Sequence, residues 1–473
     1  MTWEIVVGLE VHVQLATRSK MFCGCAVTFG APPNTHICPV CLGLPGALPV
    51  PNAQAVKLGT QAALALGSTI HEHSVFARKN YFYPDLPKGY QISQFDKPLA
   101  TGGAVQIDSP ERGPMNVSIT RLHLEEDAGK SLHDRIPGKT AVDLNRAGAP
   151  LAEIVSGHDM RSPGEARAYL TALKQILQFA GISECSMEKG SLRVDANISI
   201  RRHGDPKLGV KTEVKNMNSF ANVSRALEAE YERQAGLLES GGKVQQVTLL
   251  FNAATGTVKP MRSKEESHDY RYFPDPDLPP LVLAGSWIDE QRRSLPELPS
   301  ALRVRLQAEY AVSEYHAHQL TLDRAVADYF EAVVREGTEP ARAVGWVLGD
   351  AMTGFSEGRG FPVAPVRLAG LAGLVQDGVV SQQAAKRVYA EMETNGESPG
   401  AIAARLGLLQ VGDTGTLGQW VDEVLAANPG EVARYKGGEA RLIGFFVGQV
   451  MKKSGGKADP KKVQPVLLEK LQT

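Results

Sequence analysis

The sequence predicts an α+β domain followed by two all-α domains. Residues 1 to about 290 are rich in glycine, proline and segments in which apolar and polar residues alternate, as they do in β-strands. From about residue 295 onward, Ala, Leu, Glu and Arg predominate with the spacing of helices. Breaks fall at Pro296 to Pro299 and at the turn-forming stretch 395–400. We therefore expect domains at residues 1–292, 293–405 and 406–473.

One helix is predicted inside the first domain. Ser162 is a favoured N-cap residue, Pro163 suits the first helical position, and Glu165 stands three residues after the cap. Residues 166–180 continue the helical pattern, and Gly181 ends it. This helix and the predicted strands together indicate an α+β domain.

The composition is that of an ordinary globular protein, with 43% apolar and 22% charged residues in a chain of 473. No apolar run approaches the roughly 20 residues that span a bilayer, so we expect no membrane segment. The N-terminus moves directly into a strand pattern without the features of a signal peptide. A cytoplasmic location is therefore expected.

Four predicted strands, at 4–15, 116–127, 192–201 and 210–215, carry apolar residues on one face and polar residues on the other. A solvated outer face explains any one of these strands taken alone. The repeated pairing of a carboxylate with His, Arg, Lys or Asn also fits a face that binds divalent cations and phosphate. Its residues would include Glu10, His12, Arg121, His123, Glu125, Arg193, Asp195, Asn197, Lys211, Glu213 and Lys215.

The common nucleotide-binding and hydrolase motifs are absent from the sequence: it contains no P-loop, no kinase-type glycine loop, no H-E-x-x-H and no G-x-S-x-G. Gly138-Lys139-Thr140 looks like the end of a P-loop, but His133 replaces the required glycine, so we interpret it as a turn. If the chain uses ATP, it binds ATP in another type of site.

Four cysteines form two close pairs, Cys23-x-Cys25 and Cys38-x-x-Cys41, separated by twelve residues rich in turn formers. This spacing is typical of a structural zinc knuckle closed by four thiolates, and four free cysteines are the alternative. A closed site leaves no position for a substrate, so its expected role is to fold a loop-rich segment. Cys185 stands apart and is expected either in the core or at a neutral surface position.

Long motifs across the chain identify a family. They are GLEVHVQL at 8–15, RKNYFYPDLPKGYQ at 78–91, LHLEEDAGK at 122–130, DLNRAG at 143–148, RVDAN at 193–197, EVKNMNS at 213–219 and HDYRYFPDPD at 268–277. In these motifs the chain resembles, essentially end to end, the B subunit of the heterotrimeric aspartyl/glutamyl-tRNA amidotransferases.

The resemblance implies a fold and a reaction. The fold is a cradle domain with an antiparallel, glutamine synthetase-like sheet, then a helical domain and a small helical tail domain. In the reaction, ATP phosphorylates the acidic side chain of Glu-tRNA(Gln) or Asp-tRNA(Asn), and ammonia displaces the phosphate. A carboxylate is a poor acceptor for an amine, so the phosphoryl group is needed as a leaving group, with Mg²⁺ offsetting its charge.

Residue roles also follow from the resemblance. Glu10, His12 and Glu125 match the family's magnesium-binding positions, and Asp195 and Glu213 are further metal or nucleotide candidates. A structural ion pair is the alternative for each of the expected phosphate or substrate contacts, which are Lys79, Tyr81, Lys88, Arg193, Lys211 and Lys215.

Two further regions are assigned in the same way. Residues 262–277 are expected to close over the site, with a proline-rich linker as the alternative. Residues 430–473 hold nine Lys/Arg against four Asp/Glu, which suits binding of tRNA phosphates or a merely solvated basic face. The expected tRNA contacts in this tail are Lys436, Lys452, Lys453 and Lys457.

The ammonia source is expected outside this chain, which has no Ser-Ser-Lys amidase signature. The resemblance implies two partners, the family's A and C subunits: an amidase (glutaminase) that supplies ammonia, and a small protein that braces the pair. Two rival hypotheses are a zinc-stabilised tRNA-binding scaffold without catalysis and a free-standing metal-dependent hydrolase.

Overall fold

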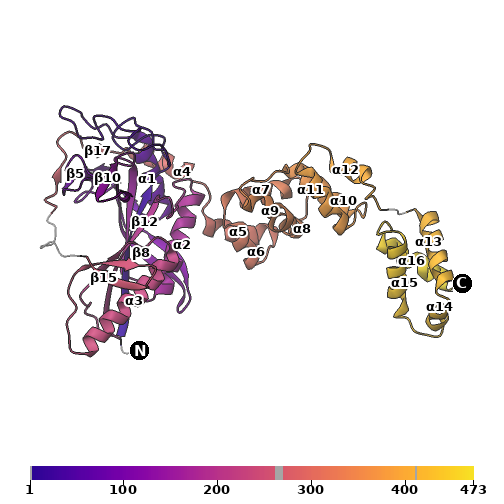
Figure 1. Cartoon of the computed structure of the whole chain (residues 1–473). Coiled ribbons are helices and arrows are strands. Elements are labelled where there is room, and N and C mark those ends of the chain that lie inside the picture. Colours follow the sequence, from indigo (N-terminus) through magenta and orange to yellow (C-terminus); the bar gives the residue numbers. More distant parts are fainter. Residues whose placement is uncertain (1–2, 262–269, 411–412, 473) are drawn as a thin grey trace. The chain divides into compact units, whose positions relative to one another are not determined.

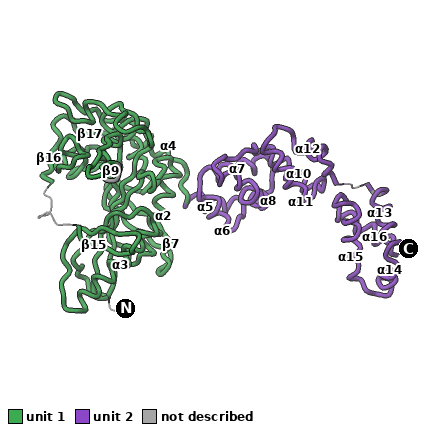
Figure 2. The backbone as a smooth tube through the Cα atoms, in the orientation of Figure 1, with its two compact units in different colours: residues 1–299 green, residues 300–473 purple. Residues whose placement is uncertain are grey.

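The chain forms two compact units, residues 1–299 and 300–473, in a computed structural model that describes residues 3–261, 270–410 and 413–472 (Figure 1, Figure 2). The first unit combines sheets with helices, and the described elements of the second are helical. The predicted mixed α+β class is therefore confirmed. The finer division at residues 405 and 406 remains a prediction.

The largest sheet has ten strands and positions the polar residues identified above. Strand β7 pairs with β8, and the others follow the spatial order β15 (Thr257–Pro260), β14 (Thr248–Asn252), β13 (Thr212–Lys215), β12 (Leu192–Arg202), β1 (Trp3–Gln14), β11 (Pro150–Ser156), β8 (Gly113–Glu126), β6 (Ala100–Thr101) and β2 (Thr69–Ile70). Strand β7 spans Ala104–Ser109. The three central strands, β12, β1 and β11, are thus far apart in the sequence.

One strand pair corrects the expectation of an antiparallel sheet, because β13 and β14 are parallel. Between them the chain forms helix α3 (Phe220–Glu239). Parallel neighbours need a crossover of a dozen or more residues, usually a helix, and α3 provides it. The other pairs of the sheet are antiparallel.

The two faces of β1 have different surroundings. Its apolar residues, among them Val7, Leu9 and Val11, are buried in a core shared with α2 (Pro163–Phe179) and α3. Figure 1 shows these two helices beside the sheet. Glu10 and His12 point to the opposite face and are only partly buried. The alternation predicted from the sequence is therefore confirmed for this strand.

Helix α2 begins and ends as the sequence indicates. The Ser162 hydroxyl accepts from the Glu165 amide at 3.1 Å, Pro163 occupies the first turn, and Gly181 follows the helix with φ +69°. The Glu165 carboxylate is buried and pairs with Arg112 at 2.6 Å. Helix α2 is thereby tied to the turn between β7 and β8.

Smaller elements complete the first unit. Gly138, with φ +71°, lies in the turn between β9 and β10, so the interpretation of that motif as a turn is confirmed. Cys185 is buried in the core, the first of its two expected positions. The remaining elements are β9 (Lys130–Ile136), β10 (Lys139–Asp143), β3 (His73–Ser74), β4 (Ala77–Asn80), β5 (Tyr90–Ser93), β16 (Phe273–Pro274), β17 (Leu281–Val282), α1 (Ala53–Ala65) and α4 (Gly285–Ser294).

The second unit is built from short amphipathic helices. In α7 the buried side chains Val326, Phe330 and Val333 recur at helical spacing. A separate core cluster unites apolar residues between Leu417 and Leu471. None of the described helices is long and apolar enough to cross a bilayer. The elements are α5 (Pro299–Tyr310), α6 (Glu314–Leu320), α7 (Arg324–Arg335), α8 (Pro340–Trp346), η1 (Val347–Ala351), α9 (Met352–Ser356), α10 (Pro365–Gln376), α11 (Gln382–Met392), α12 (Pro399–Arg405), α13 (Thr414–Ala427), α14 (Pro429–Lys436), α15 (Leu442–Lys453) and α16 (Pro460–Gln472).

The packing of α2 against the sheet can be tested with Leu173→Ala. Leu173 is fully buried, so its truncation should lower the free energy of unfolding of the first unit by about 2–5 kcal/mol. Urea denaturation followed by circular dichroism measures the change. Arg167→Ala on the exposed side of the same helix is the control and should stay within about 0.5 kcal/mol of the parent. Equal effects of the two substitutions would contradict this packing.

Candidate functional site

Three polar side chains lie in one row across the centre of the large sheet. The register pairs His12 of β1 with Glu153 of β11, and Glu153 with His123 of β8. The Glu153 carboxylate lies 3.4 Å from His12 Nε2 and 3.2 Å from His123 Nε2. Both imidazoles therefore face the same carboxylate.

Glu125 completes this cluster from the end of β8. Its carboxylate lies 3.6 Å from His12 Nε2 and 3.7 Å from His123 Nε2, and it accepts a hydrogen bond from Ser93. One ligand atom each from His12, Glu125 and Glu153 lie within 4.8 Å of one another. These three residues could hold one metal ion, with two carboxylates that suit a hard cation.

The electrostatics of the cluster favour positive charge between its carboxylates. Burial opposes ionisation of Glu153, yet the two imidazoles outweigh it and hold the pKa of that carboxyl well below its usual range. Burial likewise opposes the charged form of His123, but Glu125 and Glu153 raise its pKa to about 9. A proton on an imidazole or a bound cation would supply the charge that the two carboxylates attract.

A second cluster lies on β12 and β13. Lys215 Nζ is 2.6 Å from Asp195 and 2.9 Å from Glu213, so one ammonium bridges both predicted carboxylates. Glu10, opposite Asp195 in the register, accepts a hydrogen bond from Asn197 at 3.0 Å. Burial, followed by the charges of Glu153 and Glu213, raises the pKa of Glu10.

The predicted magnesium set therefore differs from the set that the structure brings together. His12 and Glu125 are grouped with Glu153, whereas Glu10 lies beside this group on the same face. The sequence analysis did not identify Glu153. The available signal was the single charged residue in the mostly apolar strand Pro150–Ser156, because a buried carboxylate needs partners.

Aromatic residues accompany two predicted phosphate contacts, Lys79 on β4 and Tyr81 directly after it. Lys79 Nζ lies 4.8 Å from the centre of the Tyr270 ring, and the Tyr81 hydroxyl donates to Gln91 at 3.2 Å. Burial opposes the charge of Lys79, but nearby Glu125 raises its pKa above the usual value. The predicted closing motif 262–277 is described from Tyr270 onward, and its residues 262–269 lie outside the described part.

The other predicted cations have different surroundings. Lys88 forms an ion pair with buried Glu126, and Arg193 lies 2.7 Å from buried Asp127. Lys211 is exposed just before β13. In the tail, Lys453 pairs with Glu423 across α15 and α13. The other three predicted tRNA contacts, Lys436, Lys452 and Lys457, are exposed.

The four paired cysteines lie close together. One sulfur from each of Cys23, Cys25, Cys38 and Cys41 falls within 4.8 Å of the others, and Cys38 Sγ is 3.8 Å from Cys41 Sγ. Four zinc–sulfur bonds of about 2.3 Å in a tetrahedron place the sulfurs about 3.8 Å apart. The hydrogen bond with Cys23 is the main cause that lowers the pKa of Cys41 to about 4, against the effect of burial. The cluster fits a tetrahedral metal site.

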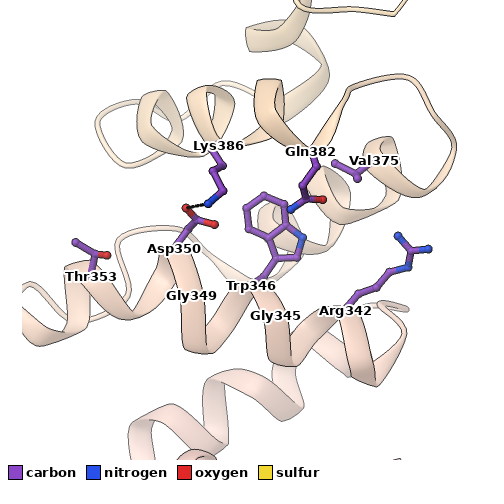
Figure 3. Close-up of a pocket in the computed structure, with 9 residues that line it drawn as sticks. All are labelled: Arg342, Gly345, Trp346, Gly349, Asp350, Thr353, Val375, Gln382 and Lys386. Carbon is purple, nitrogen blue, oxygen red and sulfur yellow. Dashed lines mark ion pairs between the residues drawn. The ribbon is translucent and has the colours of Figure 1, made fainter. Parts of the chain in front are cut away.

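Two cavities are lined by residues other than those of the polar face. One of about 590 Å³ borders the cysteine cluster at Cys23 and Cys38. The other, about 380 Å³, lies among helices of the second unit and is lined by Trp346 and by Lys386, which pairs with Asp350 at 3.7 Å (Figure 3). None of the residues predicted for the reaction lines this second cavity.

Comparison with known proteins decides the family. Residues 5–289 match the family model described as GatB/GatE catalytic domain, and residues 328–471 match the one described as GatB domain. The chain is 52% identical to the B subunit of the aspartyl/glutamyl-tRNA(Asn/Gln) amidotransferase of Nitrosococcus oceani over the full length of both chains. It is 50% identical to the proteins of that name from Geotalea uraniireducens and Geobacter sulfurreducens, again over both full lengths. The chain belongs to this B-subunit family of amidotransferases.

Membership in the B-subunit family agrees with the resemblance drawn from the motifs. The GatB/GatE catalytic domain match covers β1, β8, β11, β12 and β13, the strands that carry the polar clusters. The GatB domain match covers the described basic tail. The clusters and the tail thus lie within the two regions that match the family models.

Elemental analysis can test whether the cysteine cluster of this B-subunit family member binds a metal. We expect about one zinc ion per chain in elemental analysis of the purified protein, and loss of most of it in Cys38→Ser, because removing one of four thiolates opens the coordination sphere. Cys185→Ala is the matched control, since this cysteine lies in the core apart from the cluster. Metal content that stays equal in both variants would contradict the assignment.

Proposed function

We propose that this chain is the ATP-using subunit of a tRNA-dependent amidotransferase. It would phosphorylate the side-chain carboxylate of Glu-tRNA(Gln), Asp-tRNA(Asn) or both, and then transfer ammonia to the activated group. The observation that carries the proposal is the His12–Glu153–His123 row with Glu125, on the polar face of the sheet in the domain that matches the family's catalytic model. Full-length identity to proteins named for this activity supports it.

The donor set fits magnesium. Two buried carboxylates and an imidazole converge, and a hard divalent cation prefers such oxygen ligands. His12, Glu125 and Glu153 would hold the ion, with Glu10 beside them. Bound there, Mg²⁺ would neutralise the negative charge that ATP and the acidic side chain bring together.

The chain's own cations would orient the reacting groups. Lys79, packed against Tyr270, stands near Glu125 and would contact a phosphate oxygen. Lys215 holds Asp195 and Glu213 in place, and Arg193 is held by Asp127. Tyr81 and Lys211 are further contacts in the proposal. Lys88, bound to Glu126, would act mainly by fixing the loop that follows β4.

The proposal assigns a structural role to zinc and further roles to partners. The cysteine cluster would be closed by zinc and would take no part in the chemistry. A glutaminase partner would deliver ammonia, and a small third partner would brace the heterotrimer; the word "subunit" in the relatives' names supports such an assembly. The cradle is taken to be glutamine synthetase-like, and the reaction to occur in the cytoplasm beside translation.

A non-catalytic tRNA-binding scaffold is the second candidate. Such a scaffold needs basic residues on the sheet face but has no need for two buried carboxylates aimed at two imidazoles. Binding of mischarged tRNA without ATP turnover would favour the scaffold over the enzyme. A free-standing hydrolase would instead turn over a small substrate without tRNA.

Glu153→Gln tests the catalytic proposal. The amide keeps the size of the side chain but removes a charge between His12 and His123, so the rate of ATP-dependent amidation should fall by about 10²–10³-fold. The assay uses the assembled complex, mischarged tRNA and ammonium chloride, so that glutaminase activity is not needed. Glu228→Gln, at an exposed position on α3, is the control. Parental activity in the Glu153→Gln variant would contradict the proposed site.

Lys452→Ala combined with Lys453→Ala tests tRNA binding by the tail. Removing two phosphate contacts should weaken binding and reduce the slope of log K against log salt by about 1.4–1.8. Filter binding at several salt concentrations gives both quantities. The double change Lys207→Ala with Lys243→Ala removes the same charge from exposed positions in the first unit. If both double variants bind alike, the tail is a solvated basic face.

A further inference from the structure

Lys20 is a fully buried lysine beside the cysteine cluster. Its ammonium donates to the carbonyl oxygen of His36 at 2.8 Å and to that of Leu144 at 3.3 Å, and it lies 3.5 Å from Cys41 Sγ. An ammonium has three donors, and these three acceptors satisfy them. A buried cation in contact with a metal-binding sulfur offsets part of the charge of four thiolates.

Lys20 is one of several links between the cysteine loop and residues 142–149. Asn34 donates to the carbonyl oxygen of Val142 at 3.0 Å and accepts from the Leu144 amide at 2.8 Å. Asn145 accepts from the His36 amide at 2.8 Å and donates to the carbonyl oxygen of Pro32 at 2.7 Å. The loop that carries Cys38 is thus clamped by two asparagines, one from each side of the contact.

The other end of the segment 142–149 holds Asp127. The Asp127 amide donates to the Ala149 carbonyl at 2.8 Å, and the Gly148 amide donates to the Asp127 carbonyl at 2.8 Å. Arg146 Nε lies 3.4 Å from the Asp127 carboxylate and donates to the Ala128 carbonyl at 3.1 Å. Asp127 is therefore fixed in both its backbone and its side chain by this segment.

Asp127 connects the segment to the polar face. Its buried carboxylate lies 2.7 Å from Arg193 Nη2, and Arg193 stands opposite His12 in the register of β1 and β12. The segment also runs directly into β11, which carries Glu153. Arg193 and Glu153 of the polar face are thus both connected to the segment that contacts the cysteine loop.

We infer that the metal-bound cysteine loop positions Arg193 and Asp127 through residues 142–149, with Lys20 as its buried link. In this arrangement the cluster is more than a local fold stabiliser, because the conformation of the segment depends on the loop and the polar face depends on the segment. The inference rests on the proposed function only where it takes Arg193 to be a contact for phosphate or substrate. The proposed coupling between loop and face does not depend on the proposed function.

Zinc affinity tests the role of Lys20. In the full-length protein, Lys20→Met should weaken zinc binding by about 10–100-fold, the usual effect of losing a partner of a metal ligand. Competition with 4-(2-pyridylazo)resorcinol measures the affinity without any assay of catalysis. Lys243→Met is the control, because Lys243 is exposed in the same unit. Equal affinity in the two variants would remove Lys20 from the inference.

Hydrogen exchange tests the transmission. Asn145→Ala, which leaves the cysteines and the polar side chains intact, should speed amide exchange at Asp127 and Gly148 by about tenfold or more. Asn116→Ala, at an exposed position of β8, should leave both rates unchanged. Faster exchange confined to residues 32–36 and 142–145 would overturn the inference.

A double-mutant cycle separates coupling from general loosening. If the loop acts through Asn145, this substitution should add less than twofold to the exchange rate at Asp127 once Cys38→Ser has removed the metal. If the two substitutions instead raise the exchange rate at Asp127 by the product of their separate factors, each acts by itself. That outcome would contradict the inference. Because neither ATP nor tRNA enters these measurements, their outcome is distinguishable from a failure of the proposed function.

Discussion

The candidate site depends on the register of β1 between β11 and β12. That register sets His12 opposite Glu153 on one side and opposite Arg193 on the other. A slip of one residue would turn Glu10 and His12 into the core and expose the apolar set of β1. Burial of Val7, Leu9 and Val11 against α2 and α3 opposes such a slip. The hydrophobic core and the polar face are therefore fixed by the same pairing.

Two buried carboxylates on adjoining strands would repel each other and lose hydration if they stood alone. Glu125 and Glu153 are instead each approached by two imidazoles, and Lys79 lies near Glu125. The surrounding imidazoles lower the pKa of both carboxyls, against the effect of burial. A cluster that already draws positive charge has the electrostatics that the proposed cation site requires.

Part of this site could be predicted from the sequence because alternation is a local property. The period of two in residues 4–15 put Glu10 and His12 on one face, and the cap at Ser162 located α2. Glu153 could not be predicted in this way because β11 is buried almost throughout, so its sequence resembles that of a core strand. Its partner His12 is also distant in the chain, so no local sequence pattern indicates the contact. The parallel pairing of β13 with β14 likewise depends on where α3 returns the chain.

The cysteine loop raises a different physical question, because most of residues 15–52 lies outside regular secondary structure. Without ladders to satisfy the backbone, such a segment needs side chains, a metal or another loop to hold it. Asn34, Asn145 and Lys20 supply these contacts here, each bonding to main-chain groups of the facing segment. Such side-chain contacts can thus hold an irregular loop in place beside a sheet. The conformation of the loop then depends on these side-chain contacts, which the local periodicity of the sequence does not reveal.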